Sequence, residues 1–229
     1  MAKSPNSTPR ISINKLCEFM TAKAARQRQI LRDQKYPTDF KAIYYKEAGE
    51  AVSVSIASNL ENLKPVENAI RLLGQRTPEK IGTQRRIAAN LDALETFLMM
   101  LDDIDFKGAT PHLGDQSPPK LTVHGVDISV RPEVWLSAPG KSGAPLIGAL
   151  KVHFPHTFAL NDDSAGYVST ILQEWCKAHL ADLGAVSGTL CPVIDVGSQK
   201  VYPGVKATTA RMKDIDAICQ NVAALWPTI

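Results

Sequence analysis

Cysteine is scarce in this chain, and its few copies lie far apart. Cys17, Cys176, Cys191 and Cys219 form no Cys-x-x-Cys spacing, and no histidine pair stands near any of them. Structural zinc sites need closely spaced sulfur and nitrogen ligands, so nothing in this pattern indicates a zinc module. We therefore expect reduced and mostly buried thiols.

Long apolar runs are also missing. No stretch approaches the roughly 20 apolar residues that a membrane-spanning helix needs. The first ten residues are polar and lack the apolar segment of a secretory signal. We therefore predict no membrane partner, a location in a bacterial-type cytoplasm, and a disordered leader over residues 1–10.

The chain carries little net charge. The formal value is +3 for 229 residues, which is too small for the charge of the whole molecule to drive binding, so any basic function depends on a local cluster. Hydrophobic residues make up 44% of the sequence, enough for a sizeable buried core. No internal repeat is visible.

Two other signals for metal or nucleotide chemistry are weak. His124, His153 and His156 match no common ligand spacing, and we expect them to be scattered over the surface. The Gly-Lys-Ser of residues 140–142 resembles the end of a phosphate-binding loop, but the earlier glycine of that loop is missing. We discard the nucleotide-binding interpretation.

A local basic cluster does exist, in residues 21–46. Lysines and arginines outnumber acids there by seven to two, and three tyrosines are interleaved with them. Such a composition suits phosphate contacts with base stacking. The alternative is a solvated helix face. We predict a nucleic-acid-binding surface that contains Arg26, Arg28, Arg32 and Lys35.

One long stretch of the chain is of β type. Apolar and polar residues alternate over residues 126–131, which places Asp127 on the polar face of a strand, with Glu133 beyond it on the same side. Residues 146–154 alternate in the same way and place Lys151 on one face. We therefore expect two carboxylates and a lysine to meet on one face of a sheet.

Several helix ends carry capping signals. Ser12 is expected to cap a first helix, and Pro65 to start a short helix that Gly74 ends. Residues 77–79 read Thr-Pro-Glu, a typical helix start, and residues 161–164 form another cap region.

These signals divide the chain into two parts. Residues 11–107 are predicted as a helical, partly basic N-terminal region, and residues 108–119 as a loop because glycine and proline crowd there. Residues 120–229 are predicted as an α/β core with a hairpin around residues 197–199. We expect the helix of residues 83–106 to pack on this core.

The order of elements from that helix onward is helix, three strands, helix, strand pair and helix. It resembles the core of the PD-(D/E)XK nuclease superfamily, in which a helix precedes a three-stranded antiparallel element, a crossover helix follows and a further strand joins the sheet. The resemblance covers about residues 83–229. Residues 132–133 (Pro-Glu) resemble the opening proline and acid of the motif, and residues 149–151 (Ala-Leu-Lys) resemble its closing acid-x-lysine. Ala149 stands where the acid is expected, and Glu95 resembles an acid that many members carry on the preceding helix.

This resemblance implies an α/β (α+β) fold with a restriction-endonuclease-like mixed sheet flanked by helices. It also implies phosphodiester hydrolysis with Mg²⁺ or Mn²⁺, ions that carboxylate oxygens bind well. The catalytic residues would be Glu133, Lys151 and Asp127, with Asp127 replacing the acid missing at Ala149. The metal ligands would be Glu133, Asp127 and Glu95.

Two functions follow as expectations. The first is a metal-dependent nuclease acting on DNA or RNA, in a defence or mobile-element setting. The second is an inactive nuclease fold that binds nucleic acid or a partner protein, which Ala149 favours. The same residues also fit a charge ladder on a solvated face, in which Asp127, Arg131 and Glu133 lie across strands and Lys151 pairs with one of them.

Overall fold

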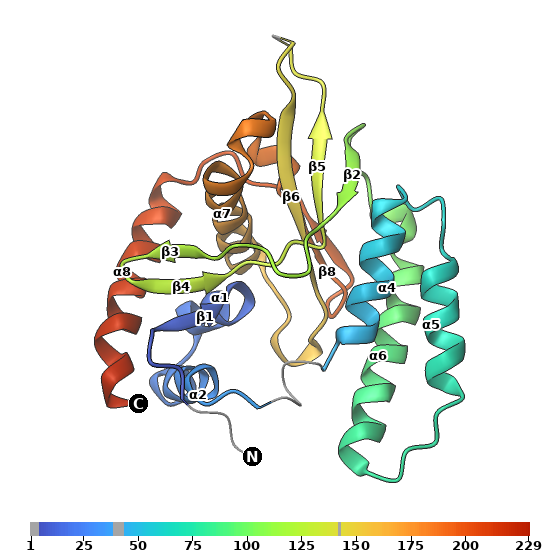
Figure 1. Cartoon of the computed structure of the whole chain (residues 1–229), viewed down its shortest axis with the longest axis horizontal. Helices are drawn as coiled ribbons and strands as arrows, with labels where there is room; N and C mark the ends of the chain where they lie inside the picture. Colours follow the sequence, from blue (N-terminus) through green and yellow to red (C-terminus); the bar gives the residue numbers. More distant parts are fainter. Residues whose placement is uncertain (1–4, 39–43, 142) are drawn as a thin grey trace.

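The largest sheet of the protein lies between two groups of helices (Figure 1). The computed structural model describes residues 5–38, 44–141 and 143–229, and the mixed α/β class predicted from the sequence is confirmed. The strand order is β2-β5-β6-β8-β9, and β7 also pairs with β6. These strands are β2 (Thr110–Leu113), β5 (Val134–Ala138), β6 (Leu146–His153), β7 (Ala185–Val186), β8 (Val193–Asp195) and β9 (Lys200–Tyr202).

Strand directions divide this sheet into two parts. β2, β5 and β6 are joined by antiparallel pairing, β8 runs parallel to β6, and β9 returns antiparallel to β8. The parallel step from β6 to β8 requires a crossover, which α7 (Asp162–His179) supplies. β6 is therefore the central strand, and its near-continuous apolar run reflects burial on both faces.

One face of the sheet is covered by a helical hairpin and a third helix: α4 (Lys46–Ala57), α5 (Lys64–Gly74) and α6 (Ile81–Met99). Val52 of α4 and Phe97 of α6 pack with Leu150 and Val152, the residues of β6 that point to this side. α6 is followed by a short 3-10 helix, η1 (Leu101–Asp103).

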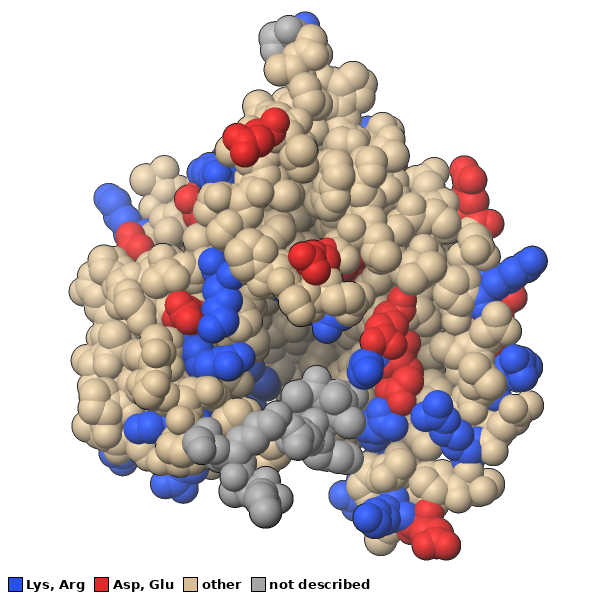
Figure 2. Space-filling model, in the orientation of Figure 1, with Lys and Arg blue, Asp and Glu red and all other residues tan. Residues whose placement is uncertain are grey.

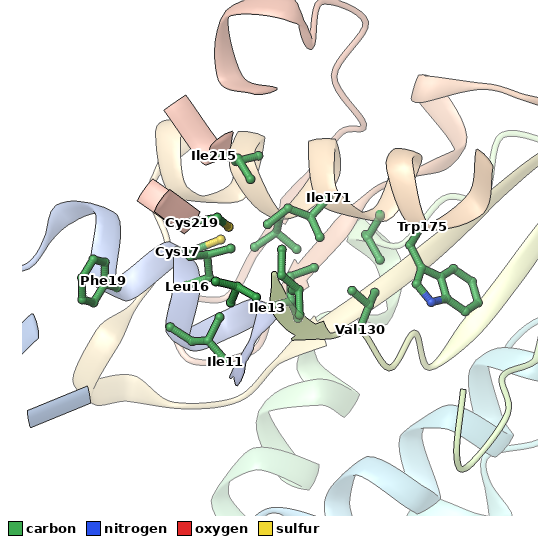
Figure 3. Close-up of a cluster of buried hydrophobic side chains, with 14 of the residues drawn as sticks. Ile11, Ile13, Leu16, Cys17, Phe19, Val130, Ile171, Trp175, Ile215 and Cys219 are labelled. Atoms are coloured by element: carbon green, nitrogen blue, oxygen red, sulfur yellow. The ribbon is translucent and has the colours of Figure 1, made fainter. Parts of the chain in front are cut away.

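The other face is covered by α7. α1 (Ile13–Thr21) and α8 (Thr209–Leu225) pack on α7, and α2 (Ala24–Lys35) packs on α1. Figure 3 shows Leu16 and Cys17 of α1 facing Ile171 of α7 and Cys219 of α8. All four cysteines are free and buried, as predicted. The remaining 3-10 helices are η2 (His156–Phe158), η3 (Ala181–Leu183), η4 (Gly188–Leu190) and η5 (Trp226–Thr228).

Residues 126–129 belong to a second, smaller sheet, so the prediction that they lie beside residues 146–154 is wrong. β4 (Val126–Ser129) pairs antiparallel with β3 (Leu121–Val123) and parallel with β1 (Arg10–Ser12), and not with the large sheet. The predicted alternation is correct, since Val126 and Ile128 are fully buried. Alternation identifies the buried face of a strand but does not identify its partner, and here that partner comes from the N-terminus.

The predicted loop of residues 108–119 contains a strand. β2 occupies Thr110–Leu113 and forms the edge of the large sheet beside β5. Pro111 reads as a loop signal in the sequence, but an edge strand tolerates proline because one side of its backbone donates to no neighbouring strand. The three-stranded antiparallel element is therefore β2-β5-β6, and the α/β core begins before residue 120.

Helix ends agree with the capping signals in most places. Ser12 caps α1 by accepting a hydrogen bond from the backbone N–H of Lys15, and α5 ends at Gly74. Asn161 and Ser164 form a reciprocal capping box at the start of α7. The helix start predicted at residues 77–79 is wrong, because α6 begins at Ile81.

The N-terminal segment is more ordered than predicted. Residues 1–4 lie outside the described residues, but the backbone N–H of Asn6 donates to the Lys35 carbonyl at 2.9 Å, and Trp226 Nε1 donates to the Asn6 carbonyl at 3.2 Å. Arg10 already begins β1. Residues 6–12 are thus part of the fold. Within the described ranges, no helix has the length and apolarity to cross a bilayer.

Candidate active site around the Glu133–Lys151 pair

The pairing of β5 with β6 brings Glu133 and Lys151 together. Val134, the first residue of β5, lies opposite Leu150 in this antiparallel ladder. Glu133, which directly precedes β5, therefore lies opposite Lys151 of β6. The backbone N–H of Glu133 donates to the Leu150 carbonyl at 3.0 Å, which extends the ladder to this position. Residues directly opposite one another share a face of the sheet. The sequence prediction that these two side chains meet is therefore correct.

The two side chains form a buried ion pair. Lys151 Nζ lies 2.6 Å from Glu133 Oε1, and each side chain is only 10% exposed. The second carboxylate oxygen, Glu133 Oε2, accepts a hydrogen bond of 2.6 Å from the backbone N–H of Val152. Both oxygens of the carboxylate are thus already bonded to donors within the protein.

Asp127 is not part of this pair. It lies on β4, in the small sheet, where Lys120 Nζ donates to its Oδ2 at 2.9 Å and Thr122 Oγ1 donates to its Oδ1 at 3.0 Å. The hydrogen bond from Lys120 is the main reason that the pKa of Asp127 lies below its usual range. Asp127 therefore stabilises a cross-strand contact of β3 and β4 and does not replace an acid at Ala149.

The other proposed metal ligand is also elsewhere. Glu95 is exposed on α6, and no hydrogen bond or ion pair involves its carboxylate within the described part of the chain. Ala149, at the position expected for the second acid, is fully buried in the core beneath α7. Over residues 5–38, 44–141 and 143–229, no three histidine, cysteine or acidic side chains form a group suited to a metal ion. The structure thus gives Glu133 no second carboxylate neighbour from the predicted set.

Two residues that the sequence analysis did not select extend the polar row beside Lys151. His153 is two residues along β6 and only 2% exposed, and Asp195 of β8 lies opposite it and is fully buried. Asp195 accepts from the backbone N–H groups of Leu160 and Gly197 and from Ser198 Oγ, at 2.6, 3.1 and 2.8 Å. The two-residue spacing of Lys151 and His153 already indicates that both side chains point to the same face of their strand.

The prediction that His153 is a surface residue is wrong. Its Nε2 lies 2.7 Å from the Phe158 carbonyl, so Nε2 carries the proton, and its buried Nδ1 has no partner among the described residues. Burial is the main reason that the pKa of His153 lies below its usual value, and the charge of Lys151 acts in the same direction. A buried, neutral imidazole therefore sits next to the Glu133–Lys151 pair.

Acidification is expected to destabilise the protein through His153. Its pKa is lower in the folded chain than the value of about 6.5 in the unfolded chain, so below that pH the unfolded chain binds more protons. The free energy of unfolding should then fall by up to about 1.4 kcal/mol per pH unit. Urea denaturation at pH 7.5, 6.5 and 5.5 measures this slope. A His153→Gln variant should show a smaller slope, and an equal slope in both proteins would contradict this origin.

The predicted basic surface separates into two sets of residues. Arg26 is bound by Glu18, with Nη2 to Oε1 at 2.5 Å, and Lys35 Nζ donates to the Trp226 carbonyl at 2.9 Å. Arg28 and Arg32 are one helical turn apart and exposed, and they line a pocket of about 320 Å³ together with Gln29 of α2 and residues 228–229. In Figure 2 a few lysine and arginine side chains lie along the lower left rim, on the side where Figure 1 places α2, and others are spread over the rest of this face.

Comparison with known proteins adds no assignment for this site. No protein-family model matches the chain, and no curated protein shows a significant sequence match to it.

Proposed function

We propose that the chain is a nuclease-like fold that binds nucleic acid and does not hydrolyse it. The proposal is supported by the element order α6, β2-β5-β6, α7 and β8, which is similar to that of the PD-(D/E)XK superfamily except that β3 and β4, strands of the small sheet, lie between β2 and β5 in the chain. Glu133 precedes the second strand of the antiparallel element, and Lys151 lies on the third. These are the positions at which the sequence motif places its first acid and its lysine.

The observation that carries this proposal is the composition of the Glu133–Lys151 site. Magnesium needs about six oxygen ligands in near-octahedral geometry, of which the protein usually supplies one or two as carboxylates with free oxygens, and water and substrate phosphates supply the rest. Here only Glu133 is present, Ala149 contributes no ligand, and both Glu133 oxygens are bound by Lys151 and by the backbone N–H of Val152. The residues present do not fit a divalent metal site of this kind.

Binding is assigned to the exposed basic side chains of α2. Arg28 and Arg32 point into the same pocket, and neither forms an ion pair with any described residue. Arginine binds phosphate oxygens through two parallel N–H donors, and each neutralised phosphate releases counterions from the nucleic acid. Two exposed arginines one turn apart on a helix, without an ion-pair partner in the part of the chain that the structure describes, therefore support contacts to a phosphate backbone.

The experiment is a binding titration with a double charge reversal. We expect the wild-type protein to bind mixed-sequence DNA or RNA in fluorescence anisotropy at low salt, and Arg28→Glu/Arg32→Glu to weaken this binding by roughly tenfold or more. Lys64→Glu/Arg71→Glu on α5 is the matched control, because it changes the net charge equally at exposed positions on a different helix. Equal loss of affinity in the two variants would show that the effect comes from net charge and not from α2.

Metal-dependent phosphodiester hydrolysis is the second candidate function. It is favoured by one observation, the 2.6 Å contact of Lys151 Nζ with Glu133 Oε1, since a lysine beside a carboxylate on adjacent strands is what the nuclease motif requires. A bound Mg²⁺ or Mn²⁺ would supply Lewis-acid stabilisation and an acidified water.

Metal addition distinguishes the two candidates. A site saturated at a hundred times its dissociation constant would add about 2.7 kcal/mol to the free energy of unfolding. We expect no rise in melting temperature with millimolar Mn²⁺ or Mg²⁺ and no cleavage of DNA or RNA substrates. A rise in the wild type that Glu133→Gln abolishes, together with cleavage, would establish the hydrolase and refute the proposed binding-only function.

A further inference from the structure

The edge of the large sheet carries a stacked pair of aromatic rings. His112 of β2 lies directly opposite Trp135 of β5 in the antiparallel ladder. The ring centroids are 3.8 Å apart, and the ring planes differ by 14°. The two rings are therefore parallel and in close contact.

A hydrogen bond fixes the orientation of the histidine ring. His112 Nε2 lies 2.8 Å from Ser137 Oγ, two residues along β5 from Trp135. Because the imidazole is held by a hydroxyl of the neighbouring strand, its plane cannot rotate away from the indole without losing this bond. The pair forms a rigid platform, which we call the Trp135–His112 platform.

Trp135 differs from the other two tryptophans of the chain. Trp175 and Trp226 are only 6% and 2% exposed, and their indole N–H groups donate to the carbonyls of Pro119 and Asn6. Trp135 is partly exposed, and no hydrogen bond from its Nε1 to another described residue occurs. Buried tryptophans generally satisfy this donor, so the position of Trp135 is not that of a core residue.

The platform lies on the same face of the sheet as the Glu133–Lys151 pair. Trp135 is opposite Ala149 in the ladder, and Ala149 is two residues from Lys151 along β6. Side chains two residues apart on a strand point to the same face and are about 7 Å apart along the strand. The platform and the Glu133–Lys151 pair therefore lie next to each other on one face of β5 and β6.

We propose that the Trp135–His112 platform stacks an unpaired nucleobase, so that the preferred ligand is single-stranded or locally unpaired nucleic acid. This inference rests on the proposed function. A flat aromatic pair accepts any base, because every base offers a π-face. The bases of an intact duplex have both faces covered by their neighbours, and they reach such a platform only after unstacking.

The test compares single-stranded and duplex oligonucleotides of one mixed sequence. The wild-type protein should bind the single strand more tightly than the duplex. Trp135→Leu should weaken single-strand binding by roughly tenfold to a hundredfold and leave duplex binding nearly unchanged. Trp135→Phe should retain most of the single-strand affinity because it keeps an aromatic ring.

Leu113→Ala is the matched control. Leu113 is 48% exposed on the same edge strand, and its neighbouring position in the ladder places it on the opposite face from His112. Its replacement should leave both affinities unchanged. Trp135 fluorescence gives a second readout, since the other two indoles are buried: the single strand should quench it in the wild type and not in Trp135→Phe.

Two contrary results have different meanings. A wild-type protein that binds single strands and duplexes equally, or a folded Trp135→Leu variant with unchanged single-strand affinity, overturns the stacking inference and leaves the proposed function intact. A wild-type protein that binds neither form overturns the proposed function, and the inference with it.

Discussion

Replacement of Lys151 by methionine is expected to lower the free energy of unfolding by about 3–5 kcal/mol, because it leaves the Glu133 carboxylate buried without its counter-charge. Methionine keeps most of the volume of the lysine stem, so the loss reports the charge and not a cavity. Denaturation in guanidinium chloride at pH 7.5 measures the difference.

Two further variants separate the ion pair from a general effect. The double variant Glu133→Gln/Lys151→Met should be more stable than Lys151→Met alone, since it removes the unpaired charge and keeps an acceptor for the N–H of Val152. Lys200→Met makes the same change at an exposed position of β9 and should cost less than about 0.5 kcal/mol. A Lys151→Met protein as stable as the wild type would mean that Glu133 and Lys151 do not form a buried pair in solution.

The second large effect is expected at Asp195. Its carboxylate is fully buried and accepts three hydrogen bonds, from Leu160, Gly197 and Ser198. Asp195→Ala leaves the buried N–H of Leu160 and the part-buried donors of Gly197 and Ser198 without this acceptor, and because an unsatisfied buried donor costs about 1–3 kcal/mol, we expect a loss of about 3 kcal/mol. Urea denaturation followed by circular dichroism measures it.

The size of this loss also depends on how many acceptors remain. Asp195→Asn keeps one carbonyl oxygen and should lose less than Asp195→Ala. Asp182→Ala, at an exposed position in η3, is the control and should be close to the wild type. If Asp195→Ala cost no more than Asp182→Ala, the loop that joins β6 to α7 would not depend on this carboxylate.

Local patterns in the sequence predict much of this fold. The capping residues of α1 and α7 and the Pro65 and Gly74 limits of α5 act through neighbours within a few residues, so they can be identified without knowledge of the tertiary structure. The meeting of Glu133 with Lys151 was also predictable, because strand alternation and a hairpin connection place both side chains on one face.

Other features depend on long-range contacts that no local pattern encodes. β4 pairs with β1 from the N-terminus, and so Asp127 lies in the small sheet and not beside Glu133. Pro111 indicates a loop in the sequence, and it fits a strand only because β2 lies at the edge of the sheet. The burial of His153 and Asp195 follows from the parallel pairing of β6 with β8, which brings together residues more than 40 positions apart.

The salt dependence of nucleic-acid affinity tests the central claim most directly. The dissociation constant of the wild-type protein for a mixed-sequence oligonucleotide should rise steadily with salt, with a log-log slope of about 0.7–0.9 for each phosphate contacted. The slope should fall by about 2 in Arg28→Glu/Arg32→Glu, since each lost phosphate contact removes about 1 unit. No binding at low salt, or a slope that is the same in both proteins, would contradict the claim that this protein binds nucleic acid through α2.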